Sequence, residues 1–311
     1  MKILVTGGAG FIGSHIVDAY VDQGHDVTTL DNLSTGRREN IHPKARFVEI
    51  DILDRDKVQT VFESAHFDLV NHHAAQIDVR RSVSDPVYDA SVNILGMLNV
   101  LECCVRSGVR RVVFASSGGA IYGEQDYFPA DEMHPTRPIS PYGVAKMSTE
   151  RYLFYYNQVH AIGSVCLRYA NVYGPRQNPE GEAGVIAIFA SKMLAGQQPV
   201  IHGDGKQTRD YVYVGDVARA NVLALRCAGM QVYNIGTGVE TDVNTLFHHL
   251  RKATRSDAKE VHGEAKKGEQ LRSVLDARRI DGDLGWKPLM PLEEGLRVTT
   301  EFFRSKAGHG F

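Results

Sequence analysis

A tyrosine–lysine pair, two serines and two glycines lie between Ser116 and Lys146, and these residue types could do acid–base chemistry. Ser140 and Pro141 are typical of the N-cap and the first position of a helix. Tyr142 and Lys146 would then lie four residues apart on one face of that helix. A neighbouring ammonium group stabilises a phenolate, and bringing a tyrosine pKa from about 10 to neutrality requires roughly 4 kcal/mol. The spacing therefore predicts a tyrosine that can ionise near neutral pH.

The start of the chain is typical of a dinucleotide site. Gly7, Gly10 and Gly13 follow the spacing GxxGxxG between a β-rich run and an amphipathic helix. Such glycines permit a tight turn, close approach of the backbone to a pyrophosphate, and close packing of helix and strand. The phosphates would meet the free N–H groups of the helix N-terminus. A second strand would end at Asp31, 18 residues after Gly13, where a carboxylate binds ribose hydroxyls and favours NAD over NADP.

Other strands would bring the serines to the same edge. Strands alternate with helices up to about residue 170, which predicts a Rossmann-type doubly wound parallel sheet. The third strand would end at Asp51 and Ile52, where an adenine could be held. The fifth would deliver Ser116 and Ser117 at its carboxyl end, where ligands bind in such sheets. We expect a Rossmann domain over 1–171, with segments near 208–236 packing on it, and a smaller mixed α/β region over 172–311.

Composition narrows the class of protein. The 311 residues are 43% hydrophobic and 23% charged, as in an ordinary globular protein. The net charge is −2 without charged blocks, so neither nucleic acid nor a membrane surface is an expected partner. No apolar run approaches the roughly 20 residues of a membrane span, and Lys2 leads directly into a strand rather than a signal peptide. We therefore expect a cytoplasmic protein.

Metal binding is not expected. Four cysteines show no metal-ligand spacing and are expected to be reduced. His72 and His73 are adjacent in a strand, so their side chains would point to opposite faces and could not share an ion. Arg37 and Arg38 could meet a 2′-phosphate, but a solvated loop is the preferred interpretation.

Nearly the whole chain resembles the extended short-chain dehydrogenase/reductase superfamily, and within it the UDP-glucose 4-epimerase family. The matching motifs are GGAGFIG, DNLSTG, HAAQ, SVSDP, AIYGE, SPYGVAK, LRYANVYGPRQ, GEAGVIAIF, TRDYVYVGDVA, YNIGTG and RSVLD. The resemblance implies that C4 of a UDP-sugar is oxidised, that the flat ketone is turned over, and that the same hydride returns to the other face. NAD would stay bound throughout, and UDP-glucose and UDP-galactose would be interconverted.

The resemblance also implies roles for matching residues. Tyr142 would be the acid/base, Lys146 would bind the nicotinamide ribose and lower the tyrosine pKa, and Tyr169 would lie beside the nicotinamide. We expect NAD contacts from Gly7, Gly10, Phe11, Ile12, Gly13, Asp31, Asn32, Leu33, Ser34, Thr35, Gly36, Asp51, Ile52, His73, Ala74, Ala75, Gln76, Asn93, Ser116, Tyr142, Lys146 and Tyr169. Asn93 could orient backbone at the site or merely satisfy buried polar groups.

The expected substrate contacts lie mainly in the second half. They are Ser117, Gly118, Tyr142, Asn171, Gly184, Val185, Arg209, Arg272 and Ser273, and the region 172–311 would mainly bind the nucleotide sugar. Arg209 would grip the UDP phosphates, and the segment from Glu182 to Ile188 would lie along the uridine. Lys266 stands where relatives often have a phosphate-binding arginine, so the charge is kept without the bidentate fork.

One position departs from the family pattern. The catalytic Ser or Thr would lie four residues before Tyr122, and that position is Gly118. Strand alternation favours Ser116 as the replacement, whereas a backbone freed by paired glycines favours Ser117. A water molecule is the third possibility. We expect Ser117 to supply the missing hydroxyl, and thus to act with Tyr142 and Lys146.

Other reactions of the superfamily remain alternatives. Sugar-nucleotide dehydratases carry an acidic pair where this chain has Gly119 and Ala120, and decarboxylases usually keep an acid there, so epimerisation is favoured. A net oxidoreductase that uses free NAD, or a non-catalytic NAD-sensing regulator, could share the fold. Ser273 would leave room for an N-acetyl group, so N-acetylhexosamines are also expected substrates. The family suggests a homodimer through the helices expected at 86–106 and 142–159.

Overall fold

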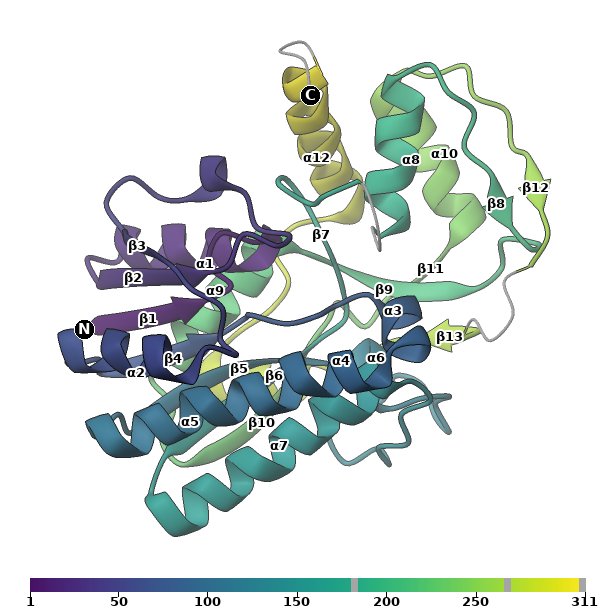
Figure 1. The fold of residues 1–311 in the computed structure, drawn as a ribbon. Helices are drawn as coiled ribbons and strands as arrows, with labels where there is room; N and C mark the ends of the chain where they lie inside the picture. Colours follow the sequence, from purple (N-terminus) through teal and green to yellow (C-terminus); the bar gives the residue numbers. More distant parts are fainter. Residues whose placement is uncertain (180–183, 266–269, 308–311) are drawn as a thin grey trace.

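The central feature is a parallel sheet of seven strands in the order β10-β6-β5-β4-β1-β2-β3. The computed structural model describes residues 1–179, 184–265 and 270–307. Helices cover both faces of the sheet (Figure 1), so the predicted Rossmann-type fold is confirmed. The strands are β1 (Lys2–Thr6), β2 (Asp26–Asp31), β3 (Arg46–Glu49), β4 (Leu69–His72), β5 (Arg111–Ser117), β6 (Gly163–Tyr169) and β10 (Met230–Ile235).

Alternating side chains fill a core on each face. In β1, Ile3 and Val5 pack towards α1 and α9, while Leu4 packs towards α2, α5 and α7. The covering helices are α1 (Phe11–Asp22), α2 (Arg55–Ser64), α5 (Gly96–Ser107), α7 (Pro141–His160), α9 (Val214–Ala224) and α11 (Arg278–Leu284). Short helices η1 (Arg38–Asn40) and α6 (Gly118–Ile121) lie between strands and helices of this part.

The long apolar segment after β4 is not one uniform helix. It consists of α3 (Val79–Ser84), α4 (Pro86–Ala90), a π-helical turn η2 (Ser91–Leu95) and α5. Asn93 lies in the π turn, where its side chain accepts from Gln76 N and donates to Gln76 O, both at 2.9 Å. Such turns often occur at functional sites. Here the turn fixes the loop that follows β4.

The third strand ends earlier than expected. β3 stops at Glu49 rather than at Asp51 and Ile52. Asp51 Oδ1 accepts the Leu53 N–H at 2.8 Å, and Asp54 caps α2 by accepting from Lys57 N. These local bonds begin a turn where the apolar pattern alone suggests a strand.

A smaller region stands beside the carboxyl edge of the sheet. Strand β9 (Thr208–Tyr213) is its centre and pairs with β7 (Asn171–Tyr173), β11 (Glu240–Asp242) and β13 (Arg272–Ser273). A two-stranded pair joins β8 (Ile201–His202) to β12 (His262–Gly263). Helices α8 (Val185–Leu194), α10 (Val243–Thr254) and α12 (Leu292–Ala307) enclose a separate core around Phe189, Phe247 and Leu296. Between β9 and β11 the chain returns to the large sheet, where α9 packs on α1 and β10 pairs with β6.

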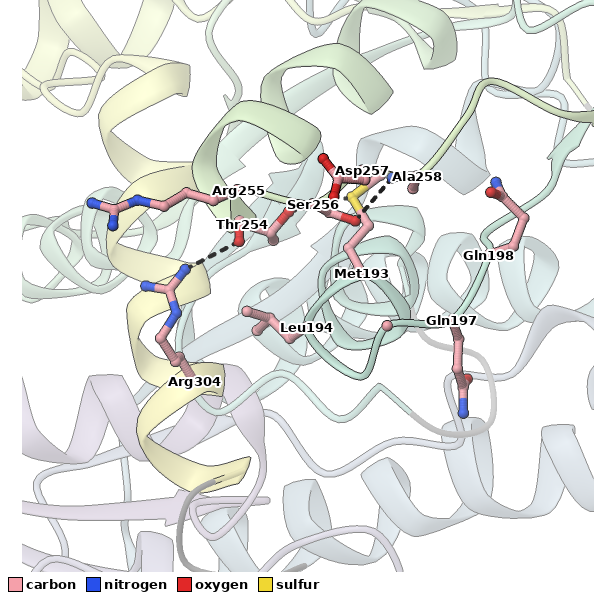
Figure 2. A pocket seen from close by; sticks show the side chains of 11 residues that line it. Met193, Leu194, Gln197, Gln198, Thr254, Arg255, Ser256, Asp257, Ala258 and Arg304 are labelled. Atoms are coloured by element: carbon pink, nitrogen blue, oxygen red, sulfur yellow. Dashed lines mark hydrogen bonds between the residues drawn. The ribbon is translucent and has the colours of Figure 1, made fainter.

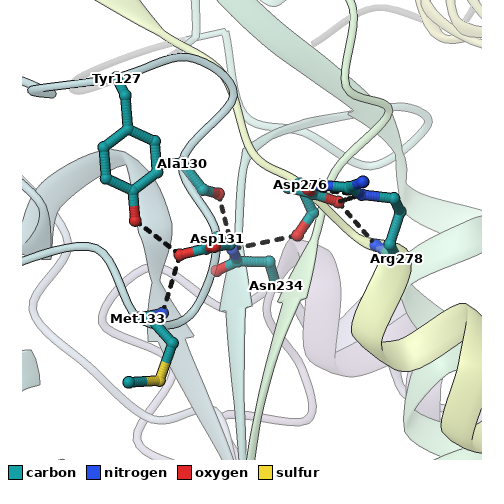
Figure 3. A network of polar contacts seen from close by, with 7 residues as sticks. All are labelled: Tyr127, Ala130, Asp131, Met133, Asn234, Asp276 and Arg278. Atoms are coloured by element: carbon teal, nitrogen blue, oxygen red, sulfur yellow. Dashed lines mark hydrogen bonds and ion pairs between the residues drawn. The ribbon is translucent and has the colours of Figure 1, made fainter.

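Polar contacts fasten the loop between α6 and α7 to the smaller region (Figure 3). Asp131 accepts from the Tyr127 hydroxyl at 2.7 Å and from Met133 N at 3.0 Å. The Asn234 side chain donates to the carbonyls of Ala130 and Asp276, which joins the loop to the segment after β13. This arrangement holds the segment after β13 against α6.

The described ranges show three further properties. No helix in them is both long enough and apolar enough to cross a membrane. They contain no group of three His, Cys, Asp or Glu side chains placed to hold a metal ion. All four cysteines are unpaired, and three of them are buried.

A buried ion pair supports the edge that carries the serines. Arg168 on β6 and Glu150 on α7 meet at 2.7 Å, and Glu150 Oε1 also accepts the Ser116 hydroxyl at 2.6 Å. Arg168 further donates to the Tyr122 hydroxyl at 2.9 Å. The network ties β5, β6, α6 and α7 together directly behind the site.

Glu150→Ala should therefore lower the free energy of unfolding by about 3–5 kcal/mol, because it leaves the Arg168 guanidinium buried without its partner. Urea denaturation measures this loss. Glu294→Ala, which removes an exposed partner of Arg297, is the matched control and should leave the midpoint nearly unchanged. Equal midpoint shifts for the two variants would contradict the importance assigned to the buried pair.

Candidate active site

The carboxyl ends of β1, β4, β5 and β6 lie side by side and carry the expected site residues. Thr6, His72 and Phe114 are neighbours in register across β1, β4 and β5, and Ser117 pairs with Tyr169 across β5 and β6. The first turns of α7 face this edge and contribute the tyrosine–lysine pair. Residues that are far apart in the sequence are thereby brought to one place.

The tyrosine and lysine share one face of α7, as their spacing predicts. Ser140 caps the helix by accepting from Gly143 N at 3.2 Å, and Pro141 is its first residue. Lys146 Nζ lies 5.6 Å from the centre of the Tyr142 ring and 4.9 Å from that of Phe114. It donates to the Ala115 carbonyl at 2.8 Å. Burial lowers the pKa of Lys146 to about 8, and the charge of Asp89 opposes this shift.

The surroundings of Tyr142 raise its pKa, which opposes ionisation of the phenol. Burial raises the pKa of the Tyr142 phenol, and the negative charge of Asp89 raises it further. A hydrogen bond from the Ser117 hydroxyl lowers the same pKa. The phenol is therefore protonated until more positive charge enters the site.

The two serines have different surroundings. The Ser117 hydroxyl is close enough to Tyr142 to lower the pKa of its phenol, and it makes no capping bond to α6, although it precedes that helix. The Ser116 hydroxyl instead donates to Glu150, in the buried network behind the edge. Of the two hydroxyls, that of Ser117 is therefore the one beside the tyrosine.

Leu275 fills the space beside Gly118. A Cβ atom built on Gly118 would lie 2.5 Å from Leu275 Cδ1, and the Leu275 side chain is fully buried. A bridge between Ala130 and Leu275 holds this segment in place. A serine or threonine at position 118 would therefore have to displace a packed core side chain.

The glycine turn forms a close cradle. Gly7 has a φ of +70°, and a Cβ on it would lie 2.5 Å from Ala74 N. A Cβ on Gly13 would lie 2.2 Å from Gly7 O. No side chain caps α1, which begins at Phe11 and continues through Ile12, so the free N–H groups at its start can receive a phosphate.

Asp31 lies at the end of β2 beside this cradle. Its Oδ1 accepts from Leu33 N at 2.8 Å and its Oδ2 from Ala9 N at 3.0 Å, which orients the carboxylate and leaves further lone pairs for ribose hydroxyls. A Cβ on Gly36 would lie 2.7 Å from the same carboxylate. The loop is closed by Asn32, which donates to Asp51 at 2.8 Å and accepts from Ser34, and exposed Thr35 follows. Ile52 is buried against Gly96.

The segment after β4 contains an unpartnered buried nitrogen. The Tyr169 hydroxyl accepts from Asn221 at 2.9 Å and lies 3.0 Å from His73 Nε2. The His73 ring is thereby held in place at the end of β4. His73 Nδ1 is buried and has no hydrogen-bond partner among the described residues. Ala74 and Ala75 follow, and both are half-buried. The cradle, Asp31 and this nitrogen fit a bound dinucleotide.

The expected substrate residues lie mainly on strands of the smaller region and at the start of α8. Asn171 begins β7 beside Gly119, and Ser273 pairs in register with Arg209 on β9, whose side chain donates to Thr208 O. Arg272 pairs with Glu240 at 2.6 Å, and its guanidinium lies over the Phe128 ring. Gly184 is the N-cap of α8 and Val185 its first residue. Glu182 and Lys266 lie outside the described residues.

The sequence patterns did not predict two residues that lie at the site. Asp89 on α4 is buried and acts electrostatically on both Lys146 and Tyr142. Its only signal in the sequence is an acid in a mainly apolar helix, four residues before Asn93. Leu275 gave no signal, because its contact with Gly118 joins segments that are distant in the sequence.

A surface pocket of about 630 Å³ lies elsewhere, beside the ends of α8, α10 and α12. Figure 2 shows mainly polar side chains around it, among them Gln197, Ser256, Asp257 and Arg304. None of the expected site residues lines it. The pocket is therefore separate from the edge that carries Tyr142.

Known proteins resemble this chain over nearly its full length. A sequence model described as "NAD dependent epimerase/dehydratase family" matches residues 3–236. A UDP-glucose 4-epimerase of Mycolicibacterium smegmatis is 45% identical over 99% of this chain and 100% of its own. The structure of UDP-glucose 4-epimerase with UDP-glucose from Thermotoga maritima has a TM-score of 0.97 and 48% identity, over 99% of this chain and 100% of that one.

A second solved structure supports the same relationship. The UDP-glucose 4-epimerase of Thermus thermophilus in complex with NAD has a TM-score of 0.94 and 44% identity, over 98% of this chain and 99% of that one. These likenesses cover both the sheet and the smaller region. The chain therefore belongs to the NAD-dependent epimerase/dehydratase family, and within it to the UDP-glucose 4-epimerases that its motifs resemble.

Proposed function

We propose that this protein is a UDP-glucose 4-epimerase that interconverts UDP-glucose and UDP-galactose with NAD held in the site. The observation that carries the proposal is the meeting of Tyr142, Lys146 and the Ser117 hydroxyl at the sheet edge, beside the glycine cradle and Asp31. The likeness to epimerases solved with UDP-glucose and with NAD supports both ligands.

The chain's own residues handle the proton. When bound, NAD accepts a hydride from C4 of the sugar and returns it. Tyr142 takes the proton of the C4 hydroxyl during oxidation and gives a proton back during reduction, and Ser117 donates a hydrogen bond to the tyrosine oxygen. Lys146 donates to the Ala115 carbonyl with one of its three N–H groups, which leaves the others for ribose hydroxyls.

Electrostatics sets when Tyr142 can act as a base. Ionising a tyrosine at neutral pH requires roughly 4 kcal/mol even in water, and burial adds to this requirement. The Lys146 cation and the Ser117 hydrogen bond offset part of it. The rest would come from the positive charge of a bound cofactor, so the tyrosine would be available as a base near neutral pH only when the site is loaded.

The neighbouring positions support epimerisation over elimination or decarboxylation. Gly119 and Ala120, at the start of α6, cannot transfer protons, whereas sugar-nucleotide dehydratases carry an acidic pair there. Asn171 lies beside Gly119 and is neutral. With no acid at these positions, the ketone formed at C4 is left to be reduced again.

Purified protein incubated with UDP-galactose, without added NAD, should produce UDP-glucose and no net NADH, because hydride leaves and returns within one site. Chromatography of the sugars and NADH absorbance measure the two. Stoichiometric NADH would instead identify a net oxidoreductase.

UDP-N-acetylglucosamine, assayed in the same way, should also be converted, because Ser273 is small and buried beside Arg209.

Ser117→Ala should lower kcat about 100-fold or more, because it removes the donor to the tyrosine oxygen. Ser117→Thr keeps a hydroxyl and should retain most of the activity. Steady-state kinetics on both variants, with folding checked by circular dichroism, measures the difference. Wild-type turnover in Ser117→Ala would show that the hydroxyl comes from another source.

We also propose a homodimer in the cytoplasm. The helices α4, η2, α5 and α7 lie against one another and leave large apolar side chains exposed, including Val87, Leu95, Phe154 and Val159. A second copy of the chain would cover this face. The unpaired cysteines support a reducing compartment.

Phe154→Asp should convert the protein from a dimer to a monomer, because it places a charge among the exposed apolar side chains of this face. Sedimentation velocity measures the mass of both proteins. A wild-type protein that is monomeric at micromolar concentration would contradict the proposed dimer.

A further inference from the structure

A buried carboxylate lies between the cofactor loop and the tyrosine–lysine pair. Asp89, in α4, is 1% exposed. Its Oδ1 accepts from Gln76 Nε2 and from Asn93 Nδ2, both at 2.9 Å. Its Oδ2 is also buried and has no hydrogen-bond partner among the described residues. Leaving a charged oxygen unpartnered away from water is costly, so a compensating positive charge is expected nearby.

Lys146 supplies positive charge to this region. Burial raises the pKa of the Asp89 carboxyl, and the charge of Lys146 opposes this shift. Helix α4 packs against α7, and Asp89 acts electrostatically on both Lys146 and Tyr142. Among the described residues, Lys146 also acts on the imidazoles of His72 and His73, at the end of β4. Burial lowers the pKa of both imidazoles, that of His72 to about 3, so both are neutral. Asp89 is thus the negative charge in this group.

We propose that Asp89 is a positioning residue with two functions, one for each oxygen. Through Oδ1 it fixes the Gln76 side chain and Asn93, and so the loop from His73 to Gln76. Through its unpartnered Oδ2 it supplies the negative charge that keeps Lys146 protonated in a dry site. The inference rests on the proposed function only in that Tyr142 and Lys146 are taken as the reacting pair.

The charge has a predictable effect on both partners. Burial favours the neutral amine of Lys146, and Asp89 opposes this by raising the lysine pKa. The same charge raises the pKa of Tyr142. Without it, the lysine and the tyrosine should each lose a proton at lower pH. Asp89 thus keeps the lysine charged while holding the tyrosine protonated until the site is loaded.

Asp89→Asn tests this directly, because it keeps the size and the Oδ1 acceptor while removing the charge. The protein without substrate is titrated by tyrosinate absorbance, as the difference between each protein and its Tyr142→Phe counterpart. The Tyr142 transition should move to lower pH by about one unit or more. The acidic limb and the basic limb of the pH profile of kcat should also both move to lower pH. An unmoved Tyr142 transition would overturn the proposal.

Two further variants separate charge from structure. Asp89→Glu keeps the charge and should restore both limbs towards wild-type pH. Asp216→Asn removes the charge of another buried carboxylate, which instead accepts from Leu289 N and Met290 N, and should lower Tm without moving either limb. If Asp89→Asn lowers kcat by the same factor at every pH and leaves both limbs unmoved, the role of Asp89 is only structural. The titration needs no turnover, so it tests Asp89 even if the substrate proves to be different.

Discussion

A lysine cation held almost out of contact with water is the constraint on which the site depends. Lys146 is only 4% exposed, and burial of an ammonium group favours its neutral form. The protein offsets this with the Ala115 carbonyl, the face of Phe114 and the carboxylate of Asp89. Two of these groups come from β5 and one from α4, so the charge of one side chain requires the correct placement of β5 and α4 against α7.

The remaining architecture serves this placement. The ion pair of Arg168 with Glu150 joins β6 to α7 behind the site and holds Ser116 away from it. The bridge between Ala130 and Leu275 brings the smaller region onto Gly118. As a result, the hydroxyl beside Tyr142 is that of Ser117, and segments from both halves of the chain meet at Gly118.

The parts of the site that depend on local geometry could be predicted from the sequence. The cap at Ser140, the shared face of Tyr142 and Lys146, and the glycine cradle each follow from spacing within one turn or one helix. The parallel sheet followed from alternating strands and helices.

Other features depend on contacts between distant segments, and the sequence could not reveal them. The packing of Leu275 on Gly118 and the action of Asp89 on Lys146 are of this kind. The choice between Ser116 and Ser117 was open because strand alternation no longer holds where β5 ends and α6 begins. The early end of β3 arose from side-chain bonds of Asp51 and Asp54, which an apolar pattern does not record.

The central claim is that one enzyme-bound hydride leaves C4 and returns to C4, while Tyr142 carries the proton. The most direct measurement follows deuterium placed at C4 of UDP-galactose, in a mixture with substrate that lacks deuterium and carries a second, distinct label. We predict that the deuterium remains at C4 of the molecule that brought it, and that Tyr142→Phe strongly slows the conversion. Deuterium found in water, or transferred to the second substrate, would contradict the account.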